Sequence, residues 1–285
     1  MKPAPFVYHA PKTVDDAVTK LAEFGPLDGR VLAGGQSLVP MMAFRMARPA
    51  HLVDINAVAG LDRLVVDGDM LSITACVRHA AFHRPVVPGP TGALLSAVVS
   101  NIAHYPIRLR GTFCGSLAHA DPASEWCLTA VTLGAEIVAA STRGRRMIAA
   151  DDYFEGMMMT VLGEDELLVE ARLPLLTPDT HFGFYEFSRR AGDYALAMAL
   201  VTYRLRDGLM VEPRVGVGGA EGRPRRISEA EAVLVGQKPG MDSFRAAADA
   251  AATATDPLED VHADAEFRLD LVRAVTRRAL EGALA

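Results

Sequence analysis

The chain has 285 residues, of which 50% are hydrophobic, so it can bury substantial cores and is long enough for two domains or for one domain with subdomains. Its formal net charge is −6 and its lysines and arginines are scattered, which argues against nucleic acid as a partner. Its three cysteines, Cys76, Cys114 and Cys127, cannot form an even disulfide framework and are fewer than the roughly four thiolates of an iron–sulfur cluster, which favours a reducing, cytoplasmic setting.

The first part of the chain has the pattern of a β-α-β unit. Thr13, followed by apolar residues at helical spacing, predicts a capped amphipathic helix that ends near Gly25-Pro26. Pro49 marks a break before the next apolar run. In this part we expect strands over 6–8, 30–32 and 51–55 and helices over 13–25 and 38–45.

The middle of the chain predicts two hairpins and two apolar helices. The hairpin turns fall at Asp67-Gly-Asp69 and Arg143-Gly-Arg145, and a break rich in proline and glycine covers 85–92. The most apolar long stretch, 128–140, is short and contains Glu136, so we expect neither a signal peptide nor a transmembrane helix. The expected elements are strands over 64–66, 70–74, 136–140, 147–149 and 167–173 and helices over 93–103 and 124–133.

The pattern changes over 175–181, where two prolines and several polar residues predict a domain boundary. Strands are expected over 182–188, 198–206 and 215–217, and helices after them. In the last helix, Phe267, Leu271, Val275 and Ala279 share one face, and the arginines, Arg268 among them, lie off that face.

The stretch Val31–Leu38 is the first candidate for ligand binding. A short strand ends in Gly34 and Gly35, whose backbone can take positive φ and approach a ligand closely, and Gln36 and Ser37 add polar side chains. A tight strand-to-helix turn without a ligand has the same pattern. The stretch has no Walker lysine and no G-x-G-x-x-G spacing, so neither a P-loop nor a Rossmann fingerprint is present.

A second stretch of similar composition, Arg110–Leu117, lies far downstream. Thr112 and Ser116 offer hydroxyl donors, and Gly115 permits close backbone approach. Two such loops could hold one diphosphate from both sides, although two unrelated turns would look the same. Cys114 in this loop is expected to pack rather than react.

Two further features could carry chemistry. His119 and Asp121 could form a metal site or an acid–base pair, but no further ligand stands at suitable spacing, so we expect them in the loop or in solvent. Tyr194, after Gly192 and Asp193, could stack on a planar ligand or pack at a domain boundary.

Together these motifs resemble the FAD-binding medium subunits of molybdenum hydroxylases, the xanthine dehydrogenase and carbon monoxide dehydrogenase family. The resemblance runs from Lys2 to the final helix. It is carried by Ala33–Ser37, Pro40–Met42, Leu52–Ile55, Thr112–Ser116, Leu117–Ala123, Gly192–Ala195 and Arg277–Leu280.

The resemblance implies an α+β fold, with a p-cresol methylhydroxylase-type FAD-binding domain followed by a C-terminal domain. The FAD-binding domain would span residues 1–176 as two α/β subdomains, 1–57 and 58–176. The C-terminal domain, 177–285, would hold a small antiparallel sheet and helices.

The resemblance also implies a set of FAD-binding residues, with no catalytic residue and no metal site in this chain. Glu125 matches a position, usually Asp, that contacts the cofactor, and the backbone of Leu168 would meet its nucleotide end. Tyr185 matches a position often filled by Lys, and Tyr194 would lie near the isoalloxazine ring. The diphosphate would be held by Val31, Leu32, Ala33, Gly34, Gly35, Gln36, Ser37, Leu38, Thr112, Phe113, Cys114, Gly115 and Ser116.

Two positions depart from the family pattern. Cys114 replaces a glycine, which would strain the backbone if that position needs positive φ, and Pro106 stands where relatives often carry Gln.

The function that the resemblance implies is electron transfer. A partner subunit with a molybdopterin cofactor would hydroxylate the substrate, and a small subunit with two [2Fe-2S] clusters would pass electrons to the FAD of this chain and on to an external acceptor. The complex would be a dimer of heterotrimers. The amino-acid sequences of the two loops are most similar to those of family members that act on N-heteroaromatic compounds. The alternatives are a self-contained flavin oxidase of the same fold and a flavin-free scaffold subunit.

Overall fold

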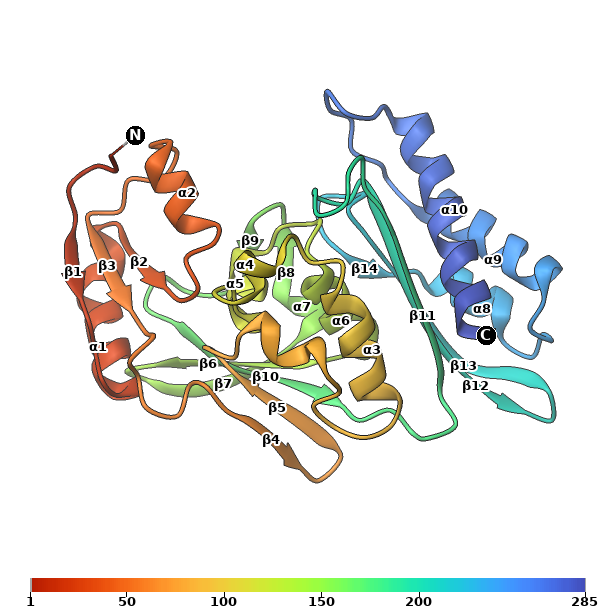
Figure 1. Cartoon of the computed structure of the whole chain (residues 1–285), viewed down its shortest axis with the longest axis horizontal. Coiled ribbons are helices and arrows are strands. Elements are labelled where there is room, and N and C mark those ends of the chain that lie inside the picture. Colours follow the sequence, from red (N-terminus) through yellow and green to blue (C-terminus); the bar gives the residue numbers. More distant parts are fainter. Residues whose placement is uncertain (1, 285) are drawn as a thin grey trace.

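The computed structural model describes residues 2–284 and arranges them as three parts side by side, each with its own sheet (Figure 1). The fold is α+β. Helices α3 (Pro90–Val99) and α6 (Glu125–Leu133) lie between the middle sheet and the C-terminal sheet, and α5 (Phe113–His119) packs on the middle sheet, as Figure 1 shows.

The first part is the expected β-α-β unit. Its three-stranded parallel sheet has the order β1-β3-β2, and Thr13 caps α1 by accepting the backbone N–H of Asp16 at 3.1 Å. Because β2 and β3 are parallel, the loops that follow them lie at the same edge. Its elements are β1 (Val7–His9), α1 (Val14–Phe24), η1 (Gly25–Leu27), β2 (Gly29–Leu32), α2 (Leu38–Ala43) and β3 (His51–Asp54).

The middle part is built on a five-stranded antiparallel sheet of order β4-β5-β10-β6-β7. Both hairpins are present, but the second turns at Thr142-Arg143, so β7 begins at Gly144, three residues before the predicted strand. The strands are β4 (Leu64–Asp67), β5 (Met70–Thr74), β6 (Glu136–Ser141), β7 (Gly144–Ala149) and β10 (Leu167–Pro174), with a separate pair β8 (Phe154–Gly156) and β9 (Met159–Thr160).

The helices of the middle part cover the sheet and lead to the cavity described below. The helix expected over 93–103 starts earlier, at Pro90, whose fixed φ suits the first helical turn, and ends at Val99. The helices are η2 (His79–His83), α3 (Pro90–Val99), α4 (Tyr105–Arg108), α5 (Phe113–His119), α6 (Glu125–Leu133) and α7 (Ala150–Tyr153).

The C-terminal part is a four-stranded antiparallel sheet covered by three helices. Its order is β11-β12-β13-β14, and α10 packs on β11, β12 and α9. The elements are β11 (His181–Phe187), β12 (Ala197–Arg206), β13 (Leu209–Gly218), β14 (Arg225–Arg226), α8 (Ser228–Leu234), α9 (Met241–Ala254) and α10 (Ala265–Leu284).

The predicted face of α10 is wrong at two residues. Arg268, expected off the apolar face, is 3% exposed, whereas Phe267, expected on it, is 43% exposed. The guanidinium of Arg268 donates to the carbonyls of Leu196 (2.8 Å) and Gly219 (3.0 Å). The chain enters β12 and leaves β13 at these two residues, so the buried arginine satisfies backbone oxygens that the sheet leaves unpaired.

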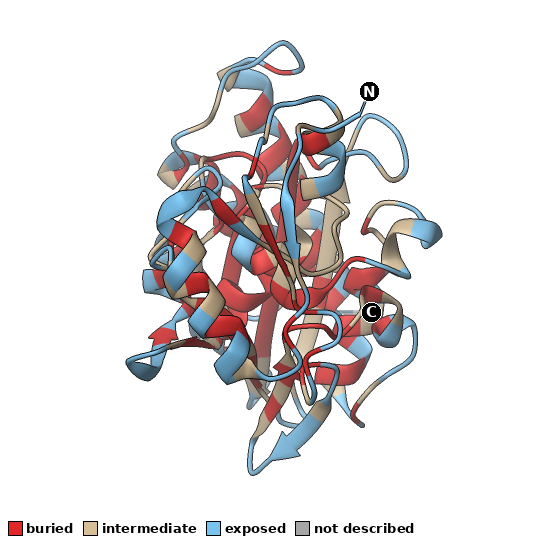
Figure 2. Ribbon diagram, turned by 90° about the vertical axis from the view of Figure 1, so that its left-hand side faces the viewer, coloured by how far each residue is buried: buried red, intermediate tan, exposed pale blue. Residues whose placement is uncertain are grey.

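Two hydrophobic cores hold the molecule together, and buried residues concentrate on the faces that meet in the interior (Figure 2). Helix α6 is buried on all sides from Trp126 to Leu133 because it packs between the middle part and strands β12 and β13. Gly216 of β13 permits this packing, since a Cβ there would lie 1.9 Å from the hydroxyl of Thr132. Within residues 2–284, no helix is both long and apolar enough to span a bilayer.

Candidate functional site

A cavity of about 540 Å³ lies between the first and middle parts and reaches the loop between β11 and β12 of the C-terminal part. Its walls come from the loop after β2, the start of α5, the start of α6, residues 160–168 and residues 192–194. This volume falls within the range typical of cofactor sites.

The loop after β2 presents a row of free backbone donors to this cavity. The N–H groups of residues 34–38 find no acceptor within residues 2–284. Gly35 has a φ of +71°, as its predicted role requires, and the side-chain amide of Gln36 donates to the carbonyl of Gly34 at 2.9 Å, which fixes the turn. Such a row of amides suits an anionic ligand.

Gly34 has a different role from the one expected. Its φ is not positive, and a Cβ there would lie 2.4 Å from the carbonyl oxygen of Arg110 and 2.7 Å from Cα of Gly111. The absent side chain therefore lets the two glycine-containing loops touch each other. They form one continuous wall of the cavity, as a two-sided clamp requires.

The second loop is the capped start of α5. Thr112 is the N-cap and its hydroxyl oxygen accepts the N–H of Gly115 at 3.0 Å. A Cβ on Gly115 would lie 2.5 Å from that oxygen, so the glycine makes room for the cap. Cys114 has helical backbone without positive φ, so the strain considered above is absent.

The three thiols are packing groups. Cys76, Cys114 and Cys127 are each buried and donate to a backbone carbonyl at 3.4 Å, and burial raises the pKa of all three thiols. The prediction that Cys114 packs is confirmed by its 2% exposure. The carboxylate of Asp121 accepts the N–H of Ala123 at 2.9 Å, the loop-bonded role expected for it.

Asn56 and Arg78 tie the two loops together. The amide of Asn56 donates to the carbonyl of Ala33 at 2.7 Å, and the guanidinium of Arg78 donates to Asn56 and to the carbonyl of Arg110, both at 2.5 Å. Burial alone would raise the pKa of Asp54, but hydrogen bonds from Tyr8 and Asn56 outweigh burial and hold it below its usual value. Asp54 thus stays ionised and anchors Asn56.

His79 forms the wall behind the second loop. Burial, followed by the charges of Arg78 and Arg108, lowers the pKa of His79 to about 3, so the ring is neutral. Its Nδ1 accepts the indole N–H of Trp126 at 2.9 Å, which places the remaining ring proton on Nε2. A Cβ on Gly111 would lie 2.5 Å from Nε2, so this glycine lets the ring approach the loop.

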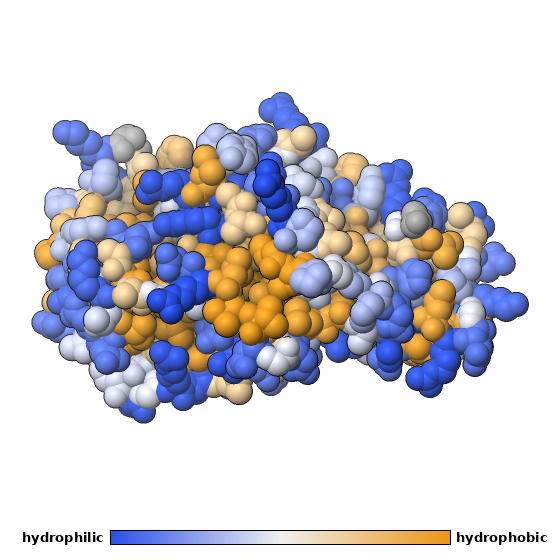
Figure 3. Space-filling view, turned by 60° about the horizontal axis from the view of Figure 1, so that its bottom comes forward, coloured by the Kyte–Doolittle hydropathy of each residue, from blue (hydrophilic) through white to orange (hydrophobic). Residues whose placement is uncertain are grey.

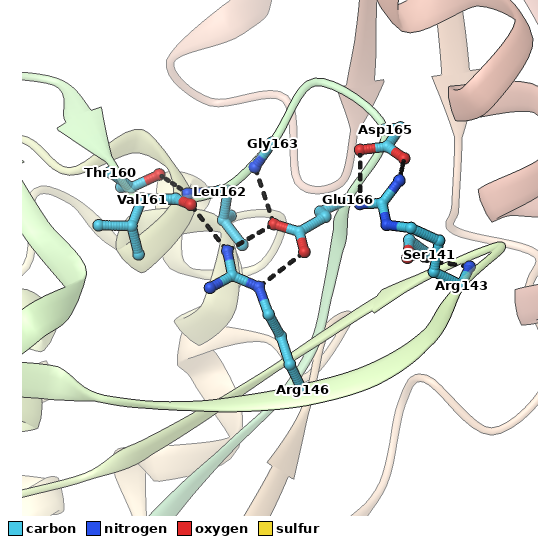
Figure 4. A network of polar contacts seen from close by, with 9 residues as sticks. All are labelled: Ser141, Arg143, Arg146, Thr160, Val161, Leu162, Gly163, Asp165 and Glu166. Atoms are coloured by element: carbon cyan, nitrogen blue, oxygen red, sulfur yellow. Dashed lines mark hydrogen bonds and ion pairs between the residues drawn. The ribbon is translucent and has the colours of Figure 1, made fainter.

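Residues of the segment 160–168 line the cavity, and two arginines of the β6–β7 hairpin hold this segment (Figure 4). Arg146 donates to both carboxylate oxygens of Glu166 at 2.7 Å and to the carbonyl of Val161 at 2.8 Å. Arg143 pairs with Asp165 in the same way, although this pair is more exposed. Glu166 also accepts the N–H of Gly163 at 2.8 Å, which bends the loop towards the cavity.

The cavity is also lined by Asp121, Glu125 and Tyr194. Tyr194 as a residue is 70% exposed, so its side chain is accessible for stacking. Burial, and then the charge of Glu186 on β11, raises the pKa of Glu125 to about 8.

Most of the residues expected to bind a cofactor line this one cavity. Leu32, Phe113 and Tyr185 do not. Leu32 belongs to β2, Phe113 is buried in the core, and the hydroxyl of Tyr185 accepts a hydrogen bond from Arg278. Some residues that line the cavity were not predicted from the sequence, among them His79, Ala103 and Ile107. The side chains that hold the cavity walls in position were not predicted either; they are Asn56, Arg78, Arg146 and Glu166.

The residues of the cavity fit FAD. The free amides of residues 34–38 suit a diphosphate, and the two loops are close enough to hold it together. Residues 160–168 and Tyr194 come from segments outside the two loops and line the same cavity, so they offer further contact surface for the rest of a dinucleotide.

Comparisons with known proteins agree on one family. The family model for the FAD-binding domain in molybdopterin dehydrogenase matches residues 4–176, and that for the C-terminal domain of the CO dehydrogenase flavoprotein matches residues 182–283. The medium subunit of nicotine 6-hydroxylase from Paenarthrobacter nicotinovorans is 38% identical over 96% of this chain and 95% of its own length.

Solved structures give the same result. The structure of carbon monoxide dehydrogenase from Hydrogenophaga pseudoflava matches with a TM-score of 0.95 and 35% identity, over 100% of this chain and 99% of the other. The structure of quinoline 2-oxidoreductase from Pseudomonas putida 86 matches with a TM-score of 0.91 and 36% identity, over 100% of both chains.

Proposed function

This chain belongs to the family of FAD-binding medium subunits of molybdenum hydroxylases, and on that basis we propose that it is the electron-transfer subunit of such an enzyme. It receives electrons from [2Fe-2S] clusters in a partner subunit and delivers them to an external acceptor. The observation that carries this proposal is the row of free amides at residues 34–38 inside a cavity whose wall is shared by two touching loops.

The residues of this chain hold and surround the cofactor. Bound FAD supplies a carrier that accepts and releases electrons singly or in pairs. The amides of residues 34–38 bind the diphosphate, residues 160–168 enclose the nucleotide end, and Tyr194 lies against the flavin end. The chain divides into an FAD-binding domain, with subdomains 1–57 and 58–176, and a C-terminal domain, 177–285. Residues of both subdomains and of the C-terminal domain line the cavity.

The iron–sulfur clusters belong to another chain. Each cysteine is buried and donates to the backbone carbonyl of another residue, and three thiols are fewer than the roughly four that a cluster needs. Within residues 2–284, no three His, Cys, Asp or Glu side chains form a group that could hold a metal ion. The complex also contains a molybdopterin-carrying large subunit and assembles as a dimer of heterotrimers in the cytoplasm. Apolar side chains gather near the middle of the face seen in Figure 3, which is typical of a surface that other proteins cover.

The substrate of the complex is an N-heteroaromatic compound. Relatives of this chain include the medium subunit of nicotine 6-hydroxylase and a subunit of caffeine dehydrogenase, and quinoline 2-oxidoreductase has the same fold. Such a substrate would react at the molybdopterin subunit, so this part of the proposal is tested on the assembled enzyme.

Purification of the chain alone and with its partners tests the function. We expect a yellow protein whose flavin is not reduced by nicotine or quinoline until the molybdopterin and iron–sulfur subunits are added. Turnover by the isolated chain would instead establish a self-contained oxidase. A colourless chain that FAD cannot reconstitute would establish a scaffold.

A further inference from the structure

Two histidines join β1, the outer strand of the first sheet, to its neighbour β3 (Figure 1). Nε2 of His9 and Nδ1 of His51 lie 3.0 Å apart, which is a hydrogen bond between two imidazole rings. The ring of Phe24, the last residue of α1, stacks on both imidazoles, with 4.3 Å between ring centroids in each case and interplanar angles of 18° and 14°. These three half-buried rings therefore hold β1, β3 and the end of α1 together.

This contact tolerates one extra proton but not two. A hydrogen bond between two ring nitrogens needs one that donates and one that accepts, so Nε2 of His9 and Nδ1 of His51 have a single proton between them. A neutral pair and a singly charged pair both meet this condition, and the π face of Phe24 favours one positive charge. A doubly charged pair does not, because both nitrogens then carry a proton and two positive charges face each other.

The surroundings of the pair also disfavour a second charge. Burial, and then the charges of His51 and Lys20, lowers the pKa of His9, and the carboxylate of Glu23 opposes them with a smaller effect. The titratable and charged side chains on β1 and β3 and on the elements packed against them, α1 and β2, are Tyr8, His9, Asp15, Asp16, Lys20, Glu23, Arg30, His51 and Asp54.

The end of α1 also touches the wall of the cavity. A Cβ on Gly25 would lie 2.4 Å from the carbonyl oxygen of Glu164, and a Cβ on Gly29 would lie 2.5 Å from that of Phe24. Gly29 and Glu164 both line the cavity, and Gly29 is paired with His51 in the β2–β3 ladder. A displacement of Phe24 would therefore shift backbone that forms this wall.

We propose that His9 and His51 form an acid-sensitive latch, which is closed by the single proton between the two rings and opens when both rings become charged. Opening releases β1 from β3 and frees the end of α1, so the cavity wall at Gly29 and Glu164 loosens and FAD is held less tightly. The effect on FAD rests on the proposed function, because it requires FAD in the cavity. The latch itself does not.

The direction of the pH effect follows from the number of protons bound. Below the ordinary histidine pKa of 6.5 the open pair takes up two extra protons, whereas the closed pair holds at most one. The latch therefore stabilises the first part fully above about pH 6.5. Its opening is favoured by up to about tenfold for each pH unit below that value.

Hydrogen exchange of the full-length chain without FAD measures this opening. After correction for the intrinsic pH dependence of exchange, the amides of β1 should lose protection by up to about tenfold between about pH 6 and pH 5 in the wild type. His83→Gln is the control, because His83 is exposed and lies on η2 of the middle part, and it should behave as the wild type does.

His9→Gln and His51→Gln should abolish this pH dependence. Glutamine carries a donor and an acceptor, so it can bond the remaining imidazole in either protonation state, and the pair can no longer become doubly charged. The protection of β1 should then stay constant between about pH 6 and pH 5. Equal losses of protection in the wild type and in both variants would overturn the proposal.

NMR of the wild type with ¹⁵N-labelled histidine tests the single proton without any substitution. A proton held between two nitrogens gives a scalar coupling across the hydrogen bond, here between Nε2 of His9 and Nδ1 of His51. The coupling should be present at about pH 7.5 and absent at about pH 5. Its absence at the higher pH, or its persistence at the lower one, would overturn the proposal.

Titration with FAD at several pH values tests the effect on the cofactor. Below about pH 6.5, the Kd for FAD should rise more steeply in the wild type and in His83→Gln than in His9→Gln. Equal slopes would overturn the part of the proposal that concerns FAD. Failure of the wild type to bind FAD at any pH would contradict the proposed function, while hydrogen exchange and NMR would still decide whether the latch exists.

Discussion

Gly34 is the residue on which the contact between the two loops depends most directly. In Gly34→Ala, the added Cβ would lie 2.4 Å from the carbonyl oxygen of Arg110, about 1 Å closer than an ordinary contact. That oxygen cannot move freely, because the guanidinium of Arg78 holds it at 2.5 Å. The loops must therefore separate, and overpacking of this kind costs about 1–3 kcal/mol.

This cost should appear as weaker FAD binding. If the separation of the loops raises the free energy of the FAD-bound state alone, the Kd for FAD should rise by about 5- to 150-fold. Titration of the apoprotein with FAD measures this change. Gly282→Ala is the control, because Gly282 lies in α10 with no atom within 4 Å of an added Cβ. A folded Gly34→Ala chain with unchanged FAD affinity would refute the argument that the two loops act together.

Three further changes test other walls of the cavity. Asn56→Ala removes the hydrogen bond to the carbonyl of Ala33 and should weaken FAD binding by about 1–2 kcal/mol in the same titration, and an unchanged Kd would show that the tie is dispensable. Arg146→Met frees Glu166 and the loop at 160–168, so limited proteolysis should cut that loop faster without FAD than in the wild type, and equal rates would contradict its role. His79→Gln tests the pH dependence of folding. Burial holds the pKa of His79 in the folded chain near 3, well below the ordinary 6.5, so the folded chain loses stability as the pH falls below about 6.5. By pH 4.5 the free energy of unfolding of the wild type should have fallen by about 2–3 kcal/mol more than that of the variant. Equal losses in denaturant titrations would mean that His79 is not buried as a neutral ring.

The local elements were predictable because local residues determine them. The cap at Thr13 and the turns of the two hairpins each depend on neighbours within about four residues, and the cap and both hairpins are present. Arg268 was predicted incorrectly because helical spacing shows which residues share a face but not that a buried carbonyl on another element requires a donor. The start of α3 was missed for a local reason, because Pro90 was assigned to the break over 85–92 although a proline suits the first helical turn.

The parts of the candidate site that consist of a short sequence motif were predictable. The parts that depend on tertiary contacts were not. The glycines of both loops stand out in the sequence, but the contact of Gly34 with Arg110 joins residues that are far apart in the chain. The hydrogen bond from Arg78 to Asn56 likewise joins the segment after β5 of the middle sheet to the segment after β3 of the first sheet. An isolated Asn or Arg gives no signal for such a role.

The central claim is that FAD binds in this cavity, and Trp126 offers the most direct test. It is the only tryptophan of the chain, and its indole is hydrogen-bonded to His79 in the cavity wall. Titration of the apoprotein with FAD should quench its fluorescence and saturate at one FAD per chain, and Gly34→Ala should shift the curve to higher FAD concentration. A fluorescence signal that FAD leaves unchanged, or a curve that Gly34→Ala does not shift, would contradict the placement of the cofactor.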